Sequence, residues 1–291
     1  MGYLAVVFAA LCGAVKGYAG KKSSETLRSV PDALRFGALR TAGCALLGAV
    51  LWLLRGDFRP PCPPAAAAAV LSGVSMSVFL LSWMAAVRGG AYVRLDVCCQ
   101  TGMVIPCVLA APLLGERASA AQYIALAFLL YSVVLLSGRA ARPLETGGFG
   151  GALLLFAVWL SSGINSLTAK LYAASDTPDT LAYTCITFGV SAPLLGIAYG
   201  ICRTRRRAHA QPRKQYALYL PLMTVCLFLY NYLTAFAAKL LPSLLLFPLQ
   251  TGLGLLLSCL MSVCLFGERL TRKNALGALL ALLSMAAVNG L

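Results

Sequence analysis

Two carboxamide side chains lie where an apolar chain gives them unusual chemistry. Gln100 and Gln250 each begin a Gln-Thr-Gly triplet and lie about nine residues into a long apolar segment, roughly 13 Å along a helix at about 1.5 Å per residue. A buried carboxamide is costly unless it hydrogen-bonds, and it can both donate and accept. We therefore predict that both residues contact a small polar ligand, with hydrogen bonding between helices as the alternative.

Further candidates share a helical spacing with other polar residues in apolar segments. Amides and indoles give directional contacts in otherwise apolar pockets, whereas serine and threonine stripes are more often close-packing faces. The predicted ligand-binding set therefore adds Trp83, Trp159, Ser162, Asn165 and Asn231. Pro106 and Pro248 lie in the same segments as the two glutamines, where each removes a backbone hydrogen bond.

Residue types that carry catalysis or bind metals are scarce. The chain has one histidine, His209, in a basic loop, and eleven cysteines without a paired CxxC arrangement. No catalytic residue, metal site or cofactor is predicted. Asp96 is the one carboxylate expected to enter the membrane, which makes it the candidate for ion coupling and a possible counter-ion for Arg40.

The elements that carry these residues are predicted to cross a membrane. The chain of 291 residues is 60% hydrophobic and 11% charged, with a mean hydropathy of +0.82, and charge-free apolar runs of about 20 residues predict spanning helices rather than a soluble core. Ten are predicted: Gly2–Ala19, Ala33–Leu54, Ala65–Val87, Ala91–Leu114, Ala118–Gly138, Gly147–Ala169, Leu181–Cys202, Tyr216–Ala238, Leu241–Phe266 and Asn274–Leu291.

An internal repeat divides the chain in two. Gln-Thr-Gly recurs after 150 residues, and the Gly-Glu-Arg triplets at Gly115 and Gly267 are 152 residues apart. We predict two five-helix repeats, 1–142 and 143–291, in one membrane domain. A repeat with five crossings ends on the membrane face opposite to the one where it began. The second repeat is therefore expected to be inverted relative to the first. The Gly-Glu-Arg triplets are expected to form structural turns in which the glutamate favours the N-terminus of the next helix, with gating ion pairs as the alternative.

The basic residues are concentrated in the loops that follow the odd-numbered spans. This bias places those loops in the cytoplasm and both termini outside. The net charge of +15 is therefore attributed to membrane orientation and anionic lipid contact, and nucleic acid is not an expected partner.

The two-fold five-helix repeat, Gly-Glu-Arg before the last helix of each half, and Arg40 in an LRxxxAxxLL-like second span resemble the drug/metabolite transporter superfamily, and within it the EamA-like branch. One departure is Cys12-Gly13 in place of a Trp-Gly pair in the first span. The resemblance implies an all-α polytopic protein of a bacterial inner membrane that carries out secondary transport by alternating access.

The favoured function is export of a small polar or amphipathic metabolite by a monomer or homodimer in the lipid bilayer. A membrane-embedded enzyme acting on a lipid-linked substrate is the alternative, and a passive channel is a weaker one. An inverted repeat without a catalytic constellation favours the transporter.

Overall fold

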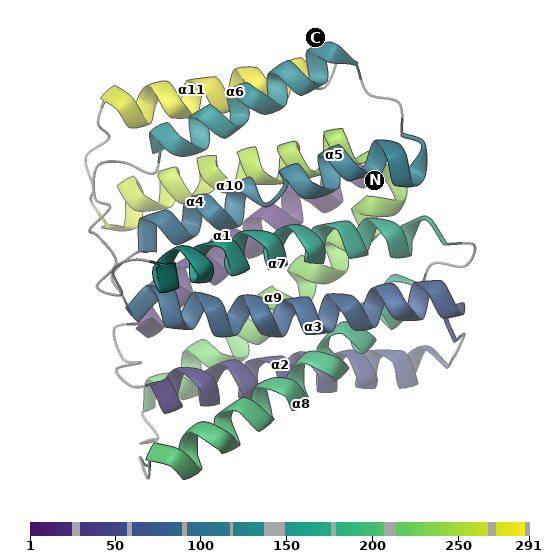
Figure 1. Cartoon of the computed structure of the whole chain (residues 1–291), viewed down its shortest axis with the longest axis vertical. Coiled ribbons are helices and arrows are strands. Elements are labelled where there is room, and N and C mark those ends of the chain that lie inside the picture. The colour runs from purple at the N-terminus through teal and green to yellow at the C-terminus, as the bar shows by residue number, and fades with distance from the viewer. Residues whose placement is uncertain are drawn as a thin grey trace.

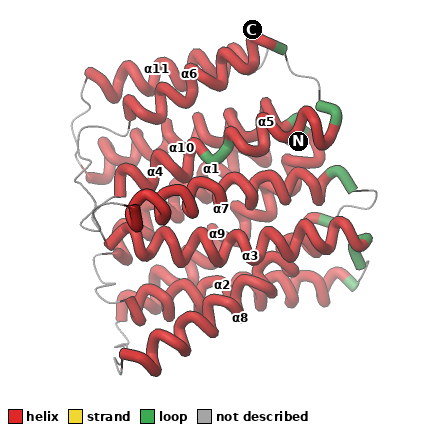
Figure 2. Tube along the Cα trace, viewed as in Figure 1, coloured by secondary structure: helices red, strands yellow, loops and turns green. Residues whose placement is uncertain are grey.

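The computed structural model describes residues 1–24, 30–56, 60–88, 92–116, 119–136, 149–175, 179–206, 214–266 and 272–288. Within these ranges the chain is helical and has no strand (Figures 1 and 2). The helices are α1 (Gly2–Ser24), α2 (Val30–Arg55), α3 (Pro63–Arg88), α4 (Tyr92–Thr101), α5 (Val104–Leu114), α6 (Ala120–Leu136), α7 (Phe149–Ala173), α8 (Thr180–Arg206), α9 (Lys214–Leu240), α10 (Ser243–Phe266) and α11 (Arg272–Val288).

Most of these helices suit a bilayer. Eight segments in the described ranges are long and apolar enough to cross a membrane, one of them spanning both α4 and α5. Helices α6 and α11 are apolar but have only 17 residues each, or about 25 Å at about 1.5 Å per residue. The chain is therefore a multi-pass, all-helical membrane protein.

The helices pack in pairs that join the two halves of the chain. The most extensive contacts are between α3 and α7, α2 and α8, α1 and α9, and α6 and α11. Figure 1 shows α6 and α11 together at one edge of the bundle, α2 and α8 at the other, and both termini at the same end of the helices.

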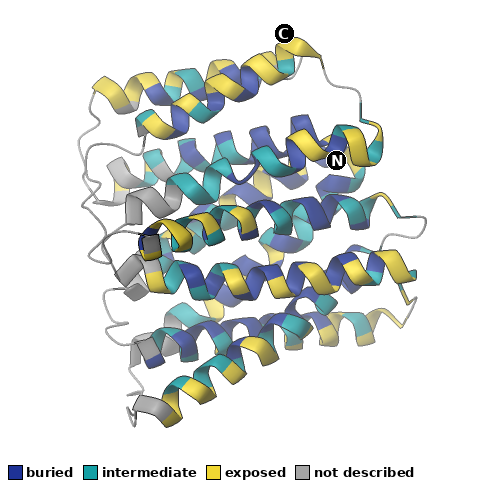
Figure 3. Cartoon of the chain, in the orientation of Figure 1, coloured by how far each residue is buried: buried dark blue, intermediate teal, exposed yellow. Residues whose placement is uncertain are grey.

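Small residues allow some of these pairs to approach closely. A Cβ atom added at Gly73 of α3 would lie 2.6 Å from the carbonyl oxygen of Thr187 in α8. Such backbone contact favours helix association in lipid, where the hydrophobic effect gives little drive. Exposed residues occur along most of the helices (Figure 3), and many of them are apolar, with Leu46, Leu53, Ile124, Ile197 and Leu283 all more than half exposed.

The predicted span Ala91–Leu114 is not one continuous helix. It breaks between Thr101 of α4 and Val104 of α5. Pro106 has no amide hydrogen, so it cannot donate to the carbonyl of Gly102, four residues earlier. Instead the amide of Ile105 donates to the carbonyl of Gly102 at 3.1 Å, an i→i+3 bond, and Thr101 Oγ1 donates to the carbonyl of Val97 at 2.7 Å. Pro248 causes no such break, since α10 is continuous around it.

Candidate functional site

A cavity of about 500 Å³ lies between helices of both halves. All the described helices except α5, α6 and α11 contribute to its lining. Its lining runs from Ala169, Tyr183 and Phe247, near one end of the helices, to Gly20, Trp83 and Met261, near the other end, where α1, α3 and α10 finish. A volume of this size suits a small-molecule ligand.

Six of the seven residues predicted to bind a ligand line this one cavity: Trp83, Gln100, Ser162, Asn165, Asn231 and Gln250. They come from five different helices, which the sequence alone does not place together. The seventh, Trp159, is not among the lining residues. Its ring stacks on Phe156 of the same helix at 5.8 Å between ring centroids.

The amide side chains are held by specific partners. Gln250 is buried, and its Nε2 donates to Thr234 Oγ1 at 2.7 Å. Asn231 Nδ2 donates to the carbonyl of Leu227 one turn earlier, at 3.0 Å. These bonds use amide donors, so the carbonyl oxygen of each side chain remains an acceptor that a ligand can meet.

Asn165 belongs to a chain of hydroxyl contacts. Ser72 Oγ donates to Asn165 Oδ1 at 2.7 Å and lies 2.8 Å from the hydroxyl of Tyr183, which also lines the cavity. Because the Asn165 oxygen accepts this bond, the amide group of this lining residue remains a donor. Together, α3, α7 and α8 fix the position of one wall.

Gln100 and Ser162 lie at the break between α4 and α5. Ser162 Oγ donates to the carbonyl of Cys99 at 3.0 Å. The backbones also approach closely there, since a Cβ at Gly163 would lie 2.7 Å from the Gly102 carbonyl oxygen. Gln100 is half-buried and makes no side-chain hydrogen bond to any residue in the described ranges.

Two cations in the cavity wall were not in the predicted set. Lys16 lies in the predicted span Gly2–Ala19, where no role was predicted for it, and α1, which continues to Ser24, places it on the cavity wall. Its Nζ lies 4.3 Å from the centroid of the Tyr230 ring. Arg40 of α2 also lines the cavity. The sequence signal was the spacing of Gly13, Lys16, Gly17 and Gly20, which share a face of α1 at the cavity.

Asp96, the candidate for ion coupling, lies in α4, but its side chain is outside the part of the chain that the structure describes. Among the described residues, no cluster of three or more histidine, cysteine or acidic side chains could hold a metal ion.

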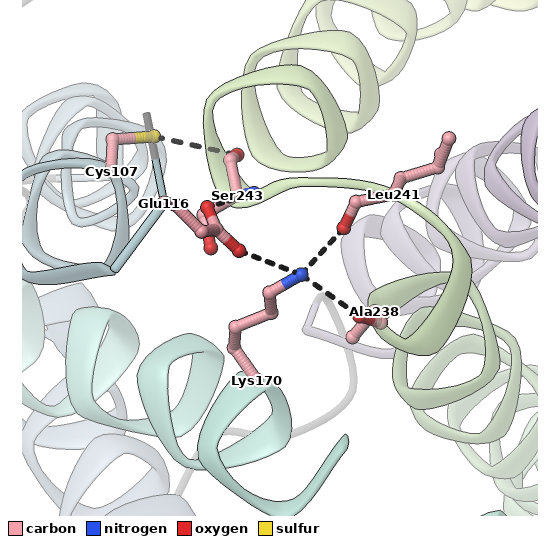
Figure 4. A network of polar contacts seen from close by, with 6 residues as sticks. All are labelled: Cys107, Glu116, Lys170, Ala238, Leu241 and Ser243. Carbon is pink, nitrogen blue, oxygen red and sulfur yellow. Dashed lines mark hydrogen bonds and ion pairs between the residues drawn. The ribbon is translucent and has the colours of Figure 1, made fainter. Parts of the chain in front are cut away.

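A buried network of polar contacts lies at the opposite end of the helices (Figure 4). Lys170 Nζ, in the last turn of α7, lies 2.9 Å from Glu116 Oε1 and donates to the carbonyls of Ala238 and Leu241 at 3.0 and 2.6 Å. Glu116 Oε2 accepts the amide of Ser243 at 2.7 Å. One carboxylate from the first half thus ties together three helices of the second.

This network corrects the role expected for Glu116. The sequence predicts that Glu116 favours the N-terminus of the following helix, but Ser119 and Gln122 cap α6 through reciprocal bonds of 3.3 and 3.1 Å. Glu116 instead accepts a hydrogen bond from the first amide of α10. Its negative charge therefore stabilises the N-terminus of a helix in the other half of the chain. Gly115 ends α5 with φ +66°, and this left-handed turn leads the chain to Glu116. The second Gly-Glu-Arg triplet lies outside the described residues.

A second ion pair lies at the same end. Arg55, the last residue of α2, lies 2.9 Å from Asp179, which precedes α8 and also accepts the amide of Leu181 at 3.0 Å. We call this side of the molecule, with Arg55, Glu116, Lys170 and Asp179, the ion-pair end. The two pairs connect helices of the first half to helices of the second.

Comparisons with known proteins agree with this architecture. Residues 149–290 match the model of the EamA-like transporter family, which belongs to the drug/metabolite transporter superfamily. No curated protein sequence matches the chain. A solved structure described only as "Crystal structure of protein" is similar in fold, with a TM-score of 0.76 and 17% sequence identity over 98% of this chain and 95% of the other.

Proposed function

We infer that this chain, which belongs to the EamA-like transporter family, is a secondary transporter that exports a small polar or amphipathic metabolite by alternating access. The observation that carries this proposal is the cavity of about 500 Å³, which brings six predicted polar and aromatic residues together in mid-bundle. Family membership does not support the alternative of a membrane-embedded enzyme.

The pattern of helix packing supports an inverted repeat of five spans in each half. If α4 and α5 count as one span, α1, α2, α3 and α6 correspond to α7, α8, α9 and α11. The observed pair α1–α9 then becomes α7–α3, also observed, while α2–α8 and α6–α11 exchange with themselves. A two-fold axis in the membrane plane relates the halves in this proposal, as in many secondary transporters.

Substrate recognition in this proposal depends on Gln100, Asn165, Asn231 and Gln250, with Trp83 and Ser162 beside them. Among the described residues, the side-chain oxygens of Asn231 and Gln250 accept no hydrogen bond and the Asn165 amide donates none, which suits a ligand that has both kinds of group. A polar group facing lipid would cost several kcal/mol, which favours the inward orientation that these residues have.

In this proposal the ion-pair end is the gate that closes the side of the cavity opposite the cytoplasm. The Lys170 ammonium group neutralises Glu116 and donates hydrogen bonds to the backbone carbonyls of Ala238 and Leu241, where α9 ends and the chain turns into α10. The cavity lining also reaches Gly20, Trp83 and Met261 near the other end, whose loops follow the odd-numbered spans and are the more basic. The positive-inside rule makes that end cytoplasmic. Substrate therefore enters from the cytoplasm, and its release requires the ion-pair end to open.

Transport is tested first by ligand screening and then by flux. A thermal-unfolding screen of the purified protein against metabolite pools identifies ligands, because a bound ligand raises apparent stability. Each ligand is then tested in counterflow with proteoliposomes. We expect accelerated exchange that Asn165→Ala and Asn231→Ala reduce, and exchange no faster than in empty liposomes would contradict the proposal.

Coupling to protons is a separate part of this proposal and depends on Asp96. If transport is driven by protons, Asp96→Asn should abolish pH-driven uptake in proteoliposomes. Uptake that persists in Asp96→Asn would remove this residue from the mechanism and leave uniport or exchange.

A further inference from the structure

One buried cation in the cavity wall has an orphaned donor. Arg40 is only 8% exposed, and its Nε has no hydrogen-bond partner among the described residues. A guanidinium carries five donors and stays protonated, so it cannot escape the cost of burial by losing its charge. Such a group is stabilised only by an acceptor or an anion close to it.

A second cation lies in the same wall. Lys16 lines the cavity together with Arg40. The Tyr230 ring gives Lys16 a cation–π contact at 4.3 Å, which offsets only part of the cost of its burial. The lining residues in the described part of the chain include no aspartate or glutamate. The cavity therefore holds two positive charges without a carboxylate in its described wall.

We propose that the cavity binds a small organic anion whose carboxylate or phosphate group lies between Arg40 and Lys16. This inference rests on the proposed transport function and names its substrate class. The guanidinium fork suits a bidentate contact with a planar carboxylate or with phosphate oxygens.

The rest of the lining indicates the remaining chemistry of the anion. Phe79, Trp83, Tyr230 and Phe247 supply aromatic surface, and Gln100, Asn165 and Asn231 supply amides. Apolar walls with a few directional polar groups are typical of sites for amphipathic ligands. The ligand is thus an acid with an apolar or aromatic body rather than an inorganic ion.

A negative substrate also has a consequence for the direction of transport. Each negative charge moved outward across an inside-negative membrane is favoured roughly fiftyfold per 100 mV. Export of an organic anion from the cytoplasmic side therefore needs no coupling ion. Movement of the anion alone would be electrogenic.

The test compares acids with uncharged analogues of the same shape on the wild-type protein. The pairs are indole-3-acetate with indole-3-acetamide, benzoate with benzamide, adipate with adipamide, and glycerol 3-phosphate with glycerol. Binding is measured at neutral pH by thermal unfolding and calorimetry in nanodiscs of phosphatidylcholine alone, which excludes an anionic lipid headgroup as the source. We expect at least one acid to bind on the order of tenfold to a hundredfold more tightly than its partner, as a charge-assisted contact provides.

Substitutions at the two cations test whether Arg40 and Lys16 cause the tighter binding of acids. Arg40→Gln and Lys16→Met should each remove most of it, and Arg40→Lys should restore part of it by keeping the charge. Arg203→Gln, at an exposed position of α8 outside the cavity, is the matched control and should leave it unchanged. If Arg40→Gln does not fold, Lys16→Met and the wild-type comparison still decide.

Equal binding of acids and analogues, no binding by any acid, or binding of inorganic phosphate or chloride alone would overturn the inference. An internal counter-ion, for which Asp96 is the sequence candidate, would also abolish the preference in the wild type. If uncharged analogues are bound and transported, the transport proposal stands and the anion inference fails. If acids bind but no bound compound is transported, the anion inference stands and the transport proposal fails.

Discussion

Gln100 and Gln250 each begin a copy of the triplet Gln-Thr-Gly. The first copy lies at a helix break, and the second lies in a continuous helix. The position of proline explains the difference. Pro106 follows Gly102 by four residues, so it leaves the Gly102 carbonyl without its normal helical donor in mid-bundle. Pro248 lies near the start of α10, where it removes a bond only in the second turn.

The side chains differ in the same way. Gln250 is buried and donates to Thr234, whereas Gln100 is half-buried and has no such bond in the described ranges. We infer that the second copy of the repeat anchors the cavity and that the first copy supplies its adaptable wall. Discontinuous helices commonly form part of the substrate site in transporters.

The largest expected effect concerns Glu116, in the turn after α5, which accepts the first amide of α10 and pairs with Lys170. Lys170→Met should lower the free energy of unfolding by about 3 kcal/mol, since it leaves a buried carboxylate unpaired. Glu116→Gln in the Lys170→Met background should recover part of this loss. Denaturant unfolding in detergent measures both, and Arg55→Gln, from the half-exposed pair, should cost less than about 1 kcal/mol. Equal costs for Lys170→Met and Arg55→Gln would refute the buried network.

The next effect tests the close approach at the break. Gly163→Ala should cost about 2 kcal/mol, because its Cβ would lie 2.7 Å from a backbone oxygen that cannot rotate away. Gly196→Ala in α8 is the control, since nothing lies within 4 Å of its added Cβ. It should leave stability unchanged or improve it slightly. A Gly163→Ala protein as stable as Gly196→Ala would show that α7 does not press on the break.

A smaller effect separates the two glutamines. Gln250→Ala should lower stability by about 1 kcal/mol, the cost of a lost buried hydrogen bond, with Thr234→Val non-additive to it. Gln100→Ala should leave stability nearly unchanged and weaken ligand affinity. Thermal unfolding and ligand titration of the same samples distinguish these outcomes. If the two variants exchange these effects, the assignment of anchor and adaptable wall is wrong.

The smallest effect on stability is expected from the prolines themselves. Pro106→Ala restores an amide that can donate to Gly102, so hydrogen exchange across 102–107 should slow while stability changes by less than about 1 kcal/mol. Pro248→Ala should leave exchange across 250–254 unchanged. Mass spectrometry of exchanged peptides measures both, and slowing in the second segment but not the first would reverse the comparison.

Hydropathy predicted the helices well because lipid forces every backbone group into intrahelical bonds. It did not predict the break at Gly102, since the same Gln-Thr-Gly triplet and a nearby proline also occur in α10, which stays continuous. Hydropathy also did not identify Lys16, which lies within the predicted span Gly2–Ala19, as a residue of the cavity wall.

The candidate site was predictable only in part. Helical spacing and amide chemistry identified six lining residues, but Trp159 shares that spacing on α7 and does not line the cavity. The pairing of Lys170 with Glu116 depends on how α7 packs against the turn after α5, and no local pattern encodes that contact. The combination of Lys16 with Arg40 likewise depends on tertiary packing, which a single sequence does not show.

The central claim, that the cavity opens alternately to the two faces, is tested most directly by labelling one lining residue. Ser166→Cys is introduced after the eleven native cysteines are replaced, and a membrane-impermeant thiol reagent is applied from each side of oriented vesicles. The account predicts reaction from both faces, and loss of reaction from the ion-pair side only, once Glu116→Cys and Lys170→Cys are joined by a bifunctional reagent. Reaction from one face alone in the uncrosslinked protein, or unchanged two-sided reaction after crosslinking, would contradict it.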